Sequence, residues 1–121
     1  MSQLQTDDDP LSDHVDKELL QSFVRLLGPD TFATIAAEVE KDILVYKHEI
    51  RALEDSSGVI PVRKLLHRLD GFAKQFGFRR LASFSSSGLT MTGADCKAVL
   101  PDCAEELGFL SKHNSLIFLG L

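Results

Sequence analysis

The sequence is poor in cysteine and has no residue spacing typical of a metal site. Cys96 and Cys103 are its two cysteines, too few for a disulfide framework. On one helix, their separation of seven residues would place them about 10 Å apart, too far for a bridge. The histidines and cysteines form no C-x-x-C or H-x-x-x-H pattern. We therefore predict no disulfide, no metal site and no resident cofactor.

The chain also lacks a long apolar run and an excess of basic residues. No run reaches the roughly 18 apolar residues that span a bilayer. The N-terminus, with Asp7–Asp9 close behind Met1–Thr6, has neither the basic start nor the apolar core of a signal peptide. With 18 acidic and 13 basic side chains, the formal net charge is −5, whereas a nucleic-acid binder needs a basic surface. We expect a cytoplasmic protein that binds neither nucleic acid nor membrane.

What the chain does contain is apolar residues at helical spacing. Hydrophobic residues make up 44% of the 121 residues and charged residues 26%, a mix typical of one soluble domain. No alternating run is long enough for a sheet. The period predicts four amphipathic helices, over residues 16–27, about 30–55, about 61–84 and about 92–112. We predict an all-α fold, an antiparallel up-down four-helix bundle over residues 15–121, with room for a short extra N-terminal helix, and a mobile acidic arm over residues 1–14.

Glycine, proline and serine mark the expected ends of these helices. Gly28-Pro29 ends the first helix and Ser56–Gly58 the second, and the third is expected to end in Ser85–Gly88. Pro101 lies inside the last segment, so that helix either kinks there or begins late. The apolar tail Leu116–Leu121 is expected to fold back onto the bundle, with a dimer contact as the alternative.

One histidine stands on the outer face of the third predicted helix. Placed at 100° per residue, the apolar stripe of this helix turns away from His67. Gly71 lies one turn further along the same side, where a glycine costs about 1 kcal/mol relative to alanine. Close approach of another backbone would explain that glycine. The charged residues on or beside this face are Arg63, Lys64, Arg68, Asp70 and Lys74. We interpret His14, His48 and His113 as ordinary surface histidines.

The segment His67–Gly77 resembles the signature of histidine-containing phosphotransfer (HPt) domains. That signature is H-x-L-K-G, followed by small residues, a polar residue and, ten positions after the histidine, a glycine. The chain matches it at His67, Leu69, Gly71, Gln75 and Gly77. Leu26–Asp30 also resembles the L-x-G-x-D entrance to the family's second helix, and the resemblance extends over about residues 16–112.

The resemblance implies a phosphoryl carrier that has no substrate of its own and is therefore not an enzyme in the usual sense. His67 would accept a phosphoryl group reversibly from an aspartate of a receiver domain, which supplies Mg²⁺, and a hybrid histidine kinase would be a second partner. The chain would act as a monomer. The expected contacts with the phosphoryl group or the partner are Gly71, Lys74, Gln75, Asp70, Arg63, Lys64 and Arg68.

The chain departs from the HPt pattern at two positions. Asp70 stands where the family has a lysine, and Phe72 where it has a small residue. Lys74 either replaces the missing lysine or pairs with Asp70. The alternative function is therefore a degenerate HPt-like bundle that binds a kinase or a receiver without carrying phosphate. A hydrolytic or metal-dependent enzyme has no support, because Ser83–Ser87 is interpreted as a loop that ends a helix.

Overall fold

Helices form all the regular structure in the part of the chain that is described. The computed structural model describes residues 11–54 and 58–119, and no strand occurs within these ranges. The elements are α2 (Lys17–Leu27), α3 (Pro29–Glu54), α4 (Val59–Phe76), α5 (Arg79–Thr90), the 3₁₀ helix η1 (Gly93–Val99), α6 (Leu100–Lys112) and α7 (Asn114–Leu119). The prediction of an all-α chain is confirmed for these residues.

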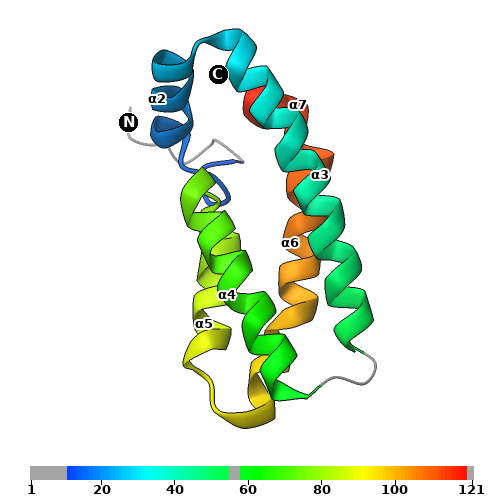
Figure 1. The fold of residues 1–121 in the computed structure, drawn as a ribbon. Coiled ribbons are helices and arrows are strands. Elements are labelled where there is room, and N and C mark those ends of the chain that lie inside the picture. Colours follow the sequence, from blue (N-terminus) through cyan, green and yellow to red (C-terminus); the bar gives the residue numbers. More distant parts are fainter. Residues whose placement is uncertain (1–10, 55–57, 120–121) are drawn as a thin grey trace.

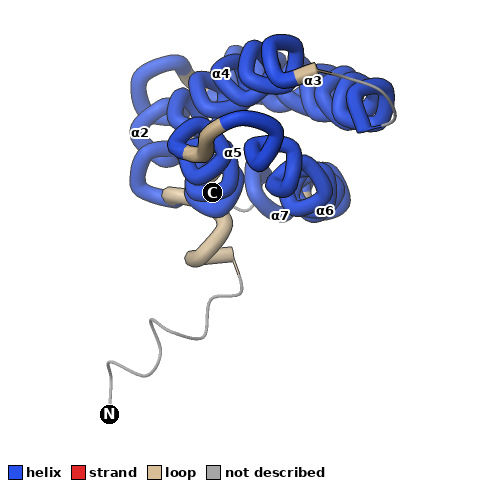
Figure 2. The backbone as a smooth tube through the Cα atoms, turned by 90° about the horizontal axis from the view of Figure 1, so that it is seen from below, coloured by secondary structure: helices blue, strands red, loops and turns tan. Residues whose placement is uncertain are grey.

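Four helices run along one long axis of the molecule. Figure 1 shows α3 and α5 running in one direction and α4 and α6 in the other, with α2 and α7 at one end. Viewed along this axis, α3 and α4 lie on one side, and α5 and α6 lie below them (Figure 2). The closest packing joins α4 to α5 and α3 to α6. This arrangement leaves the outer face of α4 uncovered by the other helices.

The break between α2 and α3 follows the sequence prediction. Asp16 caps α2, because its carboxylate accepts a hydrogen bond from the backbone N–H of Leu19 at 3.1 Å. Gly28 ends the helix with a φ of 83°, and Pro29 begins α3 directly. The predicted apolar stripe of α2 is only partly buried, since Leu20 is inaccessible whereas Leu26 is 80% exposed.

The third predicted helix is in fact two helices, so its expected end at Ser85–Gly88 is wrong. Gly77 ends α4 in the left-handed conformation, with a φ of 70°, and the N–H of Phe78 bonds back to the Ala73 carbonyl at 2.8 Å. A side chain at Gly77 would also lie 2.9 Å from Cβ of Asp16. The apolar period hides this break, because Phe78 and Leu81 continue into the same core.

The last helix begins late, as one of the two alternatives for Pro101 predicted. Pro101 lies in the first turn of α6, where its missing N–H has no partner to lose. Cys96 on η1 and Cys103 on α6 are buried free thiols, and burial raises the pKa of Cys103 to about 12. Ile117 and Phe118 of α7 are buried, so this part of the apolar tail folds back onto the helices as predicted. Residues 120 and 121 lie outside the described residues.

The packed structure begins earlier than residue 15. Residues 1–10 of the predicted arm lie outside the described residues, but Leu11 is 3% exposed and His14 is 9% exposed. His14 Nδ1 lies 2.6 Å from a carboxylate oxygen of Glu106, and its ring stacks on Phe109 at 3.7 Å. The interpretation of His14 as a surface residue is therefore wrong. Its partner is 92 positions away, so no local pattern could reveal it.

The other two histidines without a proposed role differ in exposure. His48 on α3 is exposed, as predicted. His113 is half-buried at the end of α6, where its Nδ1 lies 2.9 Å from the Phe109 carbonyl oxygen and its ring stacks on that phenylalanine. The surface interpretation of His113 is thus only partly correct.

Burial of Glu106 gives the protein a pH-dependent stability. Burial raises the pKa of Glu106 above its ordinary value of about 4.5, although the hydrogen bond to His14 and the charges of His14 and Arg80 oppose the rise. The folded state therefore holds this proton more tightly than the unfolded state. The resulting stabilisation is complete below about pH 4.5 and is lost as the pH rises through the raised folded-state pKa.

Replacement of Glu106 by glutamine should remove this dependence. The glutamine side chain would keep the size and a hydrogen bond to His14 but could not ionise. We expect the free energy of unfolding of Glu106→Gln to increase relative to that of the wild type, so that the variant gains relative stability, as the pH rises from about 4.5 to about 8. Urea titrations at several pH values measure it. A constant difference, or one that changes in the opposite direction, would contradict the assignment.

Candidate functional site

His67 lies on the outer face of α4 without an intramolecular partner in the described structure. The inner face of this helix buries Leu65, Leu66 and Leu69 completely. The helical period then turns residue 67 outward, and His67 is exposed. Its ring makes no hydrogen bond or ion pair with any residue in the described ranges. Both ring nitrogens are therefore free to react or to bind a partner.

Gly71, one turn from His67, is not required by the packing of the chain itself. It is exposed, its φ is not positive, and a side chain built at this position would meet nothing within 4 Å. Gly88 shows the contrast, since a Cβ there would lie 2.6 Å from Val99 and 2.9 Å from Leu66. The packing of neighbouring side chains thus requires a glycine at position 88, whereas no contact in the described structure requires one at position 71.

Asp70 is held in a polar cluster between α4 and α5. Its carboxylate accepts hydrogen bonds from the hydroxyls of Ser86 at 2.7 Å and Ser85 at 3.0 Å, and it pairs with Lys74 Nζ at 2.8 Å. Burial alone would raise the pKa of Asp70, but these three hydrogen bonds and the Lys74 charge together lower it. Asp70 is therefore ionised at neutral pH. Of the two alternatives for Lys74, the structure shows the pair with Asp70.

Arg63 forms hydrogen bonds that join two helices. Its guanidinium donates hydrogen bonds to the backbone carbonyls of Leu89 and Met91, both at 3.0 Å, at the C-terminal end of α5. A cation at this end also complements the helix dipole. Arg63 therefore joins the first turns of α4 to the last turn of α5.

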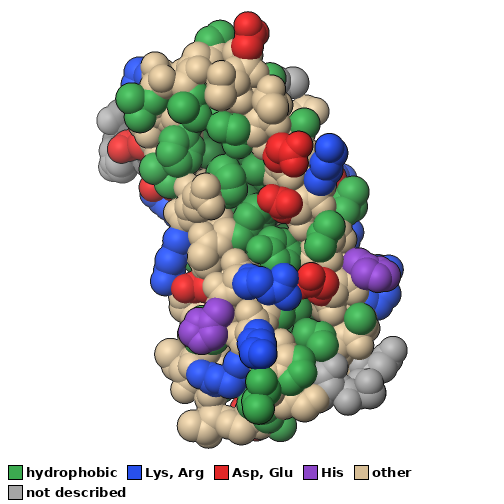
Figure 3. Space-filling view, viewed as in Figure 1, with side chains coloured by type: hydrophobic (Ala, Val, Ile, Leu, Met, Phe, Trp, Pro, Cys, Tyr) green, Lys and Arg blue, Asp and Glu red, His purple; other side chains and the backbone are tan. Residues whose placement is uncertain are grey.

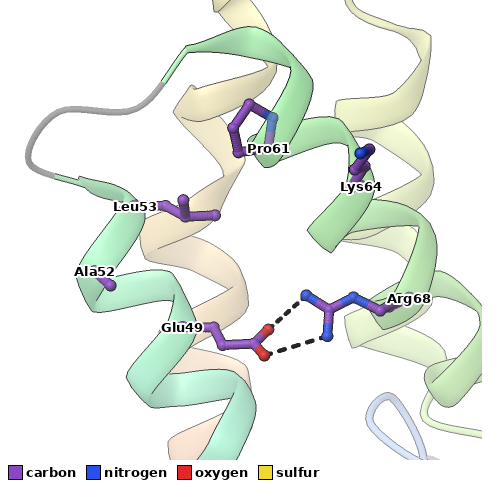
Figure 4. Close-up of a pocket in the computed structure, with 6 residues that line it drawn as sticks. All are labelled: Glu49, Ala52, Leu53, Pro61, Lys64 and Arg68. Atoms are coloured by element: carbon purple, nitrogen blue, oxygen red, sulfur yellow. Dashed lines mark hydrogen bonds and ion pairs between the residues drawn. The ribbon is translucent and has the colours of Figure 1, made fainter.

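Arg68 joins α4 to α3. Its guanidinium donates two hydrogen bonds to the Glu49 carboxylate, at 2.7 and 3.2 Å, and lies 5.9 Å from the centre of the Tyr46 ring. Figure 4 shows Arg68 and Glu49 pointing toward one another across the space between the two helices. The hydrogen bond to Glu49 raises the pKa of Arg68 further above its ordinary value.

Lys64 is the basic residue of this set that the described structure leaves unpaired. It is exposed and makes no ion pair with any residue of the described ranges. Its side chain lines a groove of about 300 Å³ between the end of α3 and the start of α4 (Figure 4). The other residues of this groove are Glu49, Ala52, Leu53, Pro61 and Arg68. Figure 3 shows several basic side chains near a histidine on the lower half of this face.

Gln75, the remaining expected contact, and Phe72, the second departure from the HPt pattern, have surroundings different from those of the charged residues near His67. Gln75 is exposed and borders an apolar hollow of about 180 Å³, which Phe23, Leu27, Ile35 and Phe76 also line. Phe72 is 7% exposed and packs with Tyr46 and Phe78, at ring distances of 5.1 and 5.6 Å. The second departure from the HPt pattern therefore adds to the core and does not alter the surface around His67.

Ser85 and Ser86 are site residues that the sequence analysis does not identify. The sequence predicts a loop here, but both serines lie within α5 and face Asp70. The left-handed glycine at position 77 is the available signal, because a turn there brings a new helix back along α4.

Within residues 11–54 and 58–119, no group of three or more histidine, cysteine, aspartate or glutamate side chains is arranged to hold a metal ion. In the same ranges, no helix has the length and apolar character needed to cross a membrane. Comparison with protein-family models, with curated proteins and with solved structures gives no match for this chain. The case for a function therefore rests on the residues themselves.

Gly71 of α4 and Gly88 of α5 should respond in opposite ways to replacement by alanine. Gly71→Ala should raise the free energy of unfolding by about 0.5–1 kcal/mol, because alanine is the better helix former and meets no atom there. Gly88→Ala should lower it by about 1–3 kcal/mol, because the methyl group would overlap Val99 and Leu66. Urea unfolding followed by circular dichroism measures both changes. Destabilisation by Gly71→Ala would show that Gly71 has an internal packing role after all.

Proposed function

We propose that this chain is a histidine phosphotransfer protein that carries a phosphoryl group on His67 between the aspartates of receiver domains. One observation supports the proposal most strongly: His67 is exposed and unpartnered in the described structure, one turn from a glycine that no internal contact requires. Open space beside a nucleophile suits a partner that must bring its own reacting group close.

The proposal includes the fold of such carriers, an antiparallel four-helix bundle. In it, α3, α4, α5 and α6 form the bundle, and His67 stands midway along α4. This set differs from the four helices expected from the sequence, which included residues 16–27 and took α4 and α5 as one helix; α2 is instead the short extra N-terminal helix. The protein would act as a cytoplasmic monomer, with receiver domains and a hybrid histidine kinase as partners. A rigid helix is a suitable support, because the bundle needs only to present one imidazole in line with the incoming phosphorus.

The transfer step is a displacement at phosphorus. The neutral imidazole carries its proton on one nitrogen, while the lone pair of the other attacks the phosphorus of the receiver's aspartyl phosphate. A P–N bond forms as the P–O bond breaks, and the aspartate carboxylate leaves with the electron pair of that bond. The remaining ring proton stays or passes to water. The reverse step returns the phosphoryl group to a receiver.

Asp70 does not exclude this chemistry, because its charge is already balanced. Lys74, Ser85 and Ser86 satisfy its carboxylate, so it presents little unpaired negative charge to an incoming phosphoryl group. The ion pair between Asp70 and Lys74 also favours the alternative, a degenerate HPt-like bundle that binds a kinase or receiver without carrying phosphate. Lys74 is tied to Asp70 and would have to leave it to meet the phosphoryl group.

Receiver-dependent phosphorylation tests the proposal. Receiver domains loaded with labelled phosphate should pass the label to the wild-type chain as acid-labile phosphohistidine. His67→Gln should remove the label completely, since no other group should accept it. His48→Gln is the matched control, because His48 is an exposed histidine on α3 and its replacement should leave labelling unchanged.

The same experiment separates the two candidates. If the wild type is never labelled, the carrier function is wrong. In that case, the degenerate bundle is supported if the wild type and His67→Gln bind a receiver with equal affinity and Gly71→Arg abolishes binding. Calorimetry of receiver binding provides these affinities.

A further inference from the structure

The basic residues around His67 differ in whether their side chains already make hydrogen bonds or ion pairs within the protein. Arg63 is bonded to two carbonyls of the α5 end, and Arg68 is bonded to both oxygens of Glu49. Lys74 is paired with Asp70 at 2.8 Å. In contrast, Lys64 makes no ion pair with any residue of the described ranges. A dianionic group on His67 would therefore meet one cation that has no existing contact to give up.

Helix geometry places Lys64 nearer to His67 along the axis of α4 than Lys74. Lys64 lies three residues before His67, about 4.5 Å along the axis, whereas Lys74 lies seven residues after it, about 10.5 Å along the axis. Side chains on a helix lean toward its N-terminus. Because His67 and both lysines share this lean, it leaves Lys64 the nearer of the two lysines to the imidazole along the helix axis.

The two lysines also differ in what movement would cost. Lys74 can turn toward His67 only by leaving Asp70, whose side chain is 16% exposed and would lose its ion pair. The exposed Lys64 lies on the α4 wall of the groove between α3 and α4, one turn from Pro61 (Figure 4). Its ammonium can therefore swing toward His67 at little more than the cost of ordering one flexible side chain.

We propose that Lys64 contacts the phosphoryl group carried on His67 and supplies the positive charge that stabilises it. This inference rests on the proposed function. It assigns the role to the residue one turn before the histidine, and it leaves Lys74 as the partner of Asp70. The Lys64 ammonium would donate hydrogen bonds to phosphoryl oxygens, and such charge-assisted bonds are among the stronger polar contacts in proteins.

A small phosphoryl donor tests the proposal without any partner protein. Phosphoramidate transfers its phosphoryl group to an exposed imidazole, with formation of a P–N bond to the histidine and release of ammonia. Phosphohistidine is detected by ³¹P NMR in the wild type and in His67→Gln. The signal that the wild type shows and the variant lacks belongs to His67. The lifetime of this signal and the pH at which its chemical shift titrates are both measured.

Lys64→Gln should shorten the lifetime of the His67 phosphoryl group by roughly 3- to 10-fold, the effect of one nearby charge at a protein surface. It should also raise the pH at which the phosphoryl group titrates, because a neighbouring cation favours the dianion. Lys64→Arg should restore both values, since it keeps the charge. Lys74→Gln, the matched control on the same helix, should change the lifetime less than about twofold.

The outcomes separate this inference from the proposed function. If the wild type shows no signal that depends on His67, the carrier function is wrong and the role of Lys64 falls with it. If the wild type is labelled and Lys64→Gln matches it in lifetime and titration, only the role of Lys64 is wrong. A large effect of Lys74→Gln in place of Lys64→Gln would assign the contact to Lys74.

Discussion

The burial of one face of α4 determines the rest of the site. Leu65, Leu66 and Leu69 are inaccessible to solvent, and each is held in the core that α4 shares with its neighbours. Because a helix turns about 100° per residue, fixing these three side chains inward fixes His67 and Gly71 outward. Rotation of α4 that hid the histidine would expose these leucines, at about 1.5–3 kcal/mol for each side chain. The exposure of His67 is thus a consequence of the core.

Two of the four basic residues around His67 are paired with carboxylates. The chain has a formal net charge of −5, but the sequence places four basic residues and one acidic residue on or beside the His67 face. In the structure, Glu49 pairs with Arg68 and Asp70 pairs with Lys74, so those two cations add little net positive charge. The Arg68–Glu49 pair also links α4 to α3, and the hydrogen bonds from Ser85 and Ser86 to Asp70 link α4 to α5. The pairing reduces the free positive charge of the face to a small region near the start of α4.

Much of the fold, and the position of the candidate nucleophile, could be predicted from apolar periodicity and from glycine and proline. Gly28-Pro29 separates α2 from α3 as expected, and Pro101 lies in the first turn of α6. The break at Gly77 could not be predicted in this way, because the apolar period continues through it and the residues on both sides enter one core. The bonds from Ser85 and Ser86 to Asp70 are hidden for the same reason, since they require α5 to return along α4. The burial of His14 depends on Glu106, which only the tertiary structure brings near.

The open space beside His67 is tested most directly by the rate of phosphoryl transfer from a loaded receiver domain to Gly71→Ala. A methyl group at this position meets no atom of the described chain, so any effect on transfer must come from the partner. If a receiver packs against this face, transfer to the variant should be roughly tenfold to a hundredfold slower than to the wild type, because small misplacements of reacting groups have large effects on rate. Transfer at the wild-type rate would show that the receiver does not approach Gly71 closely, and would contradict the proposal that a partner packs against the outer face of α4 beside His67.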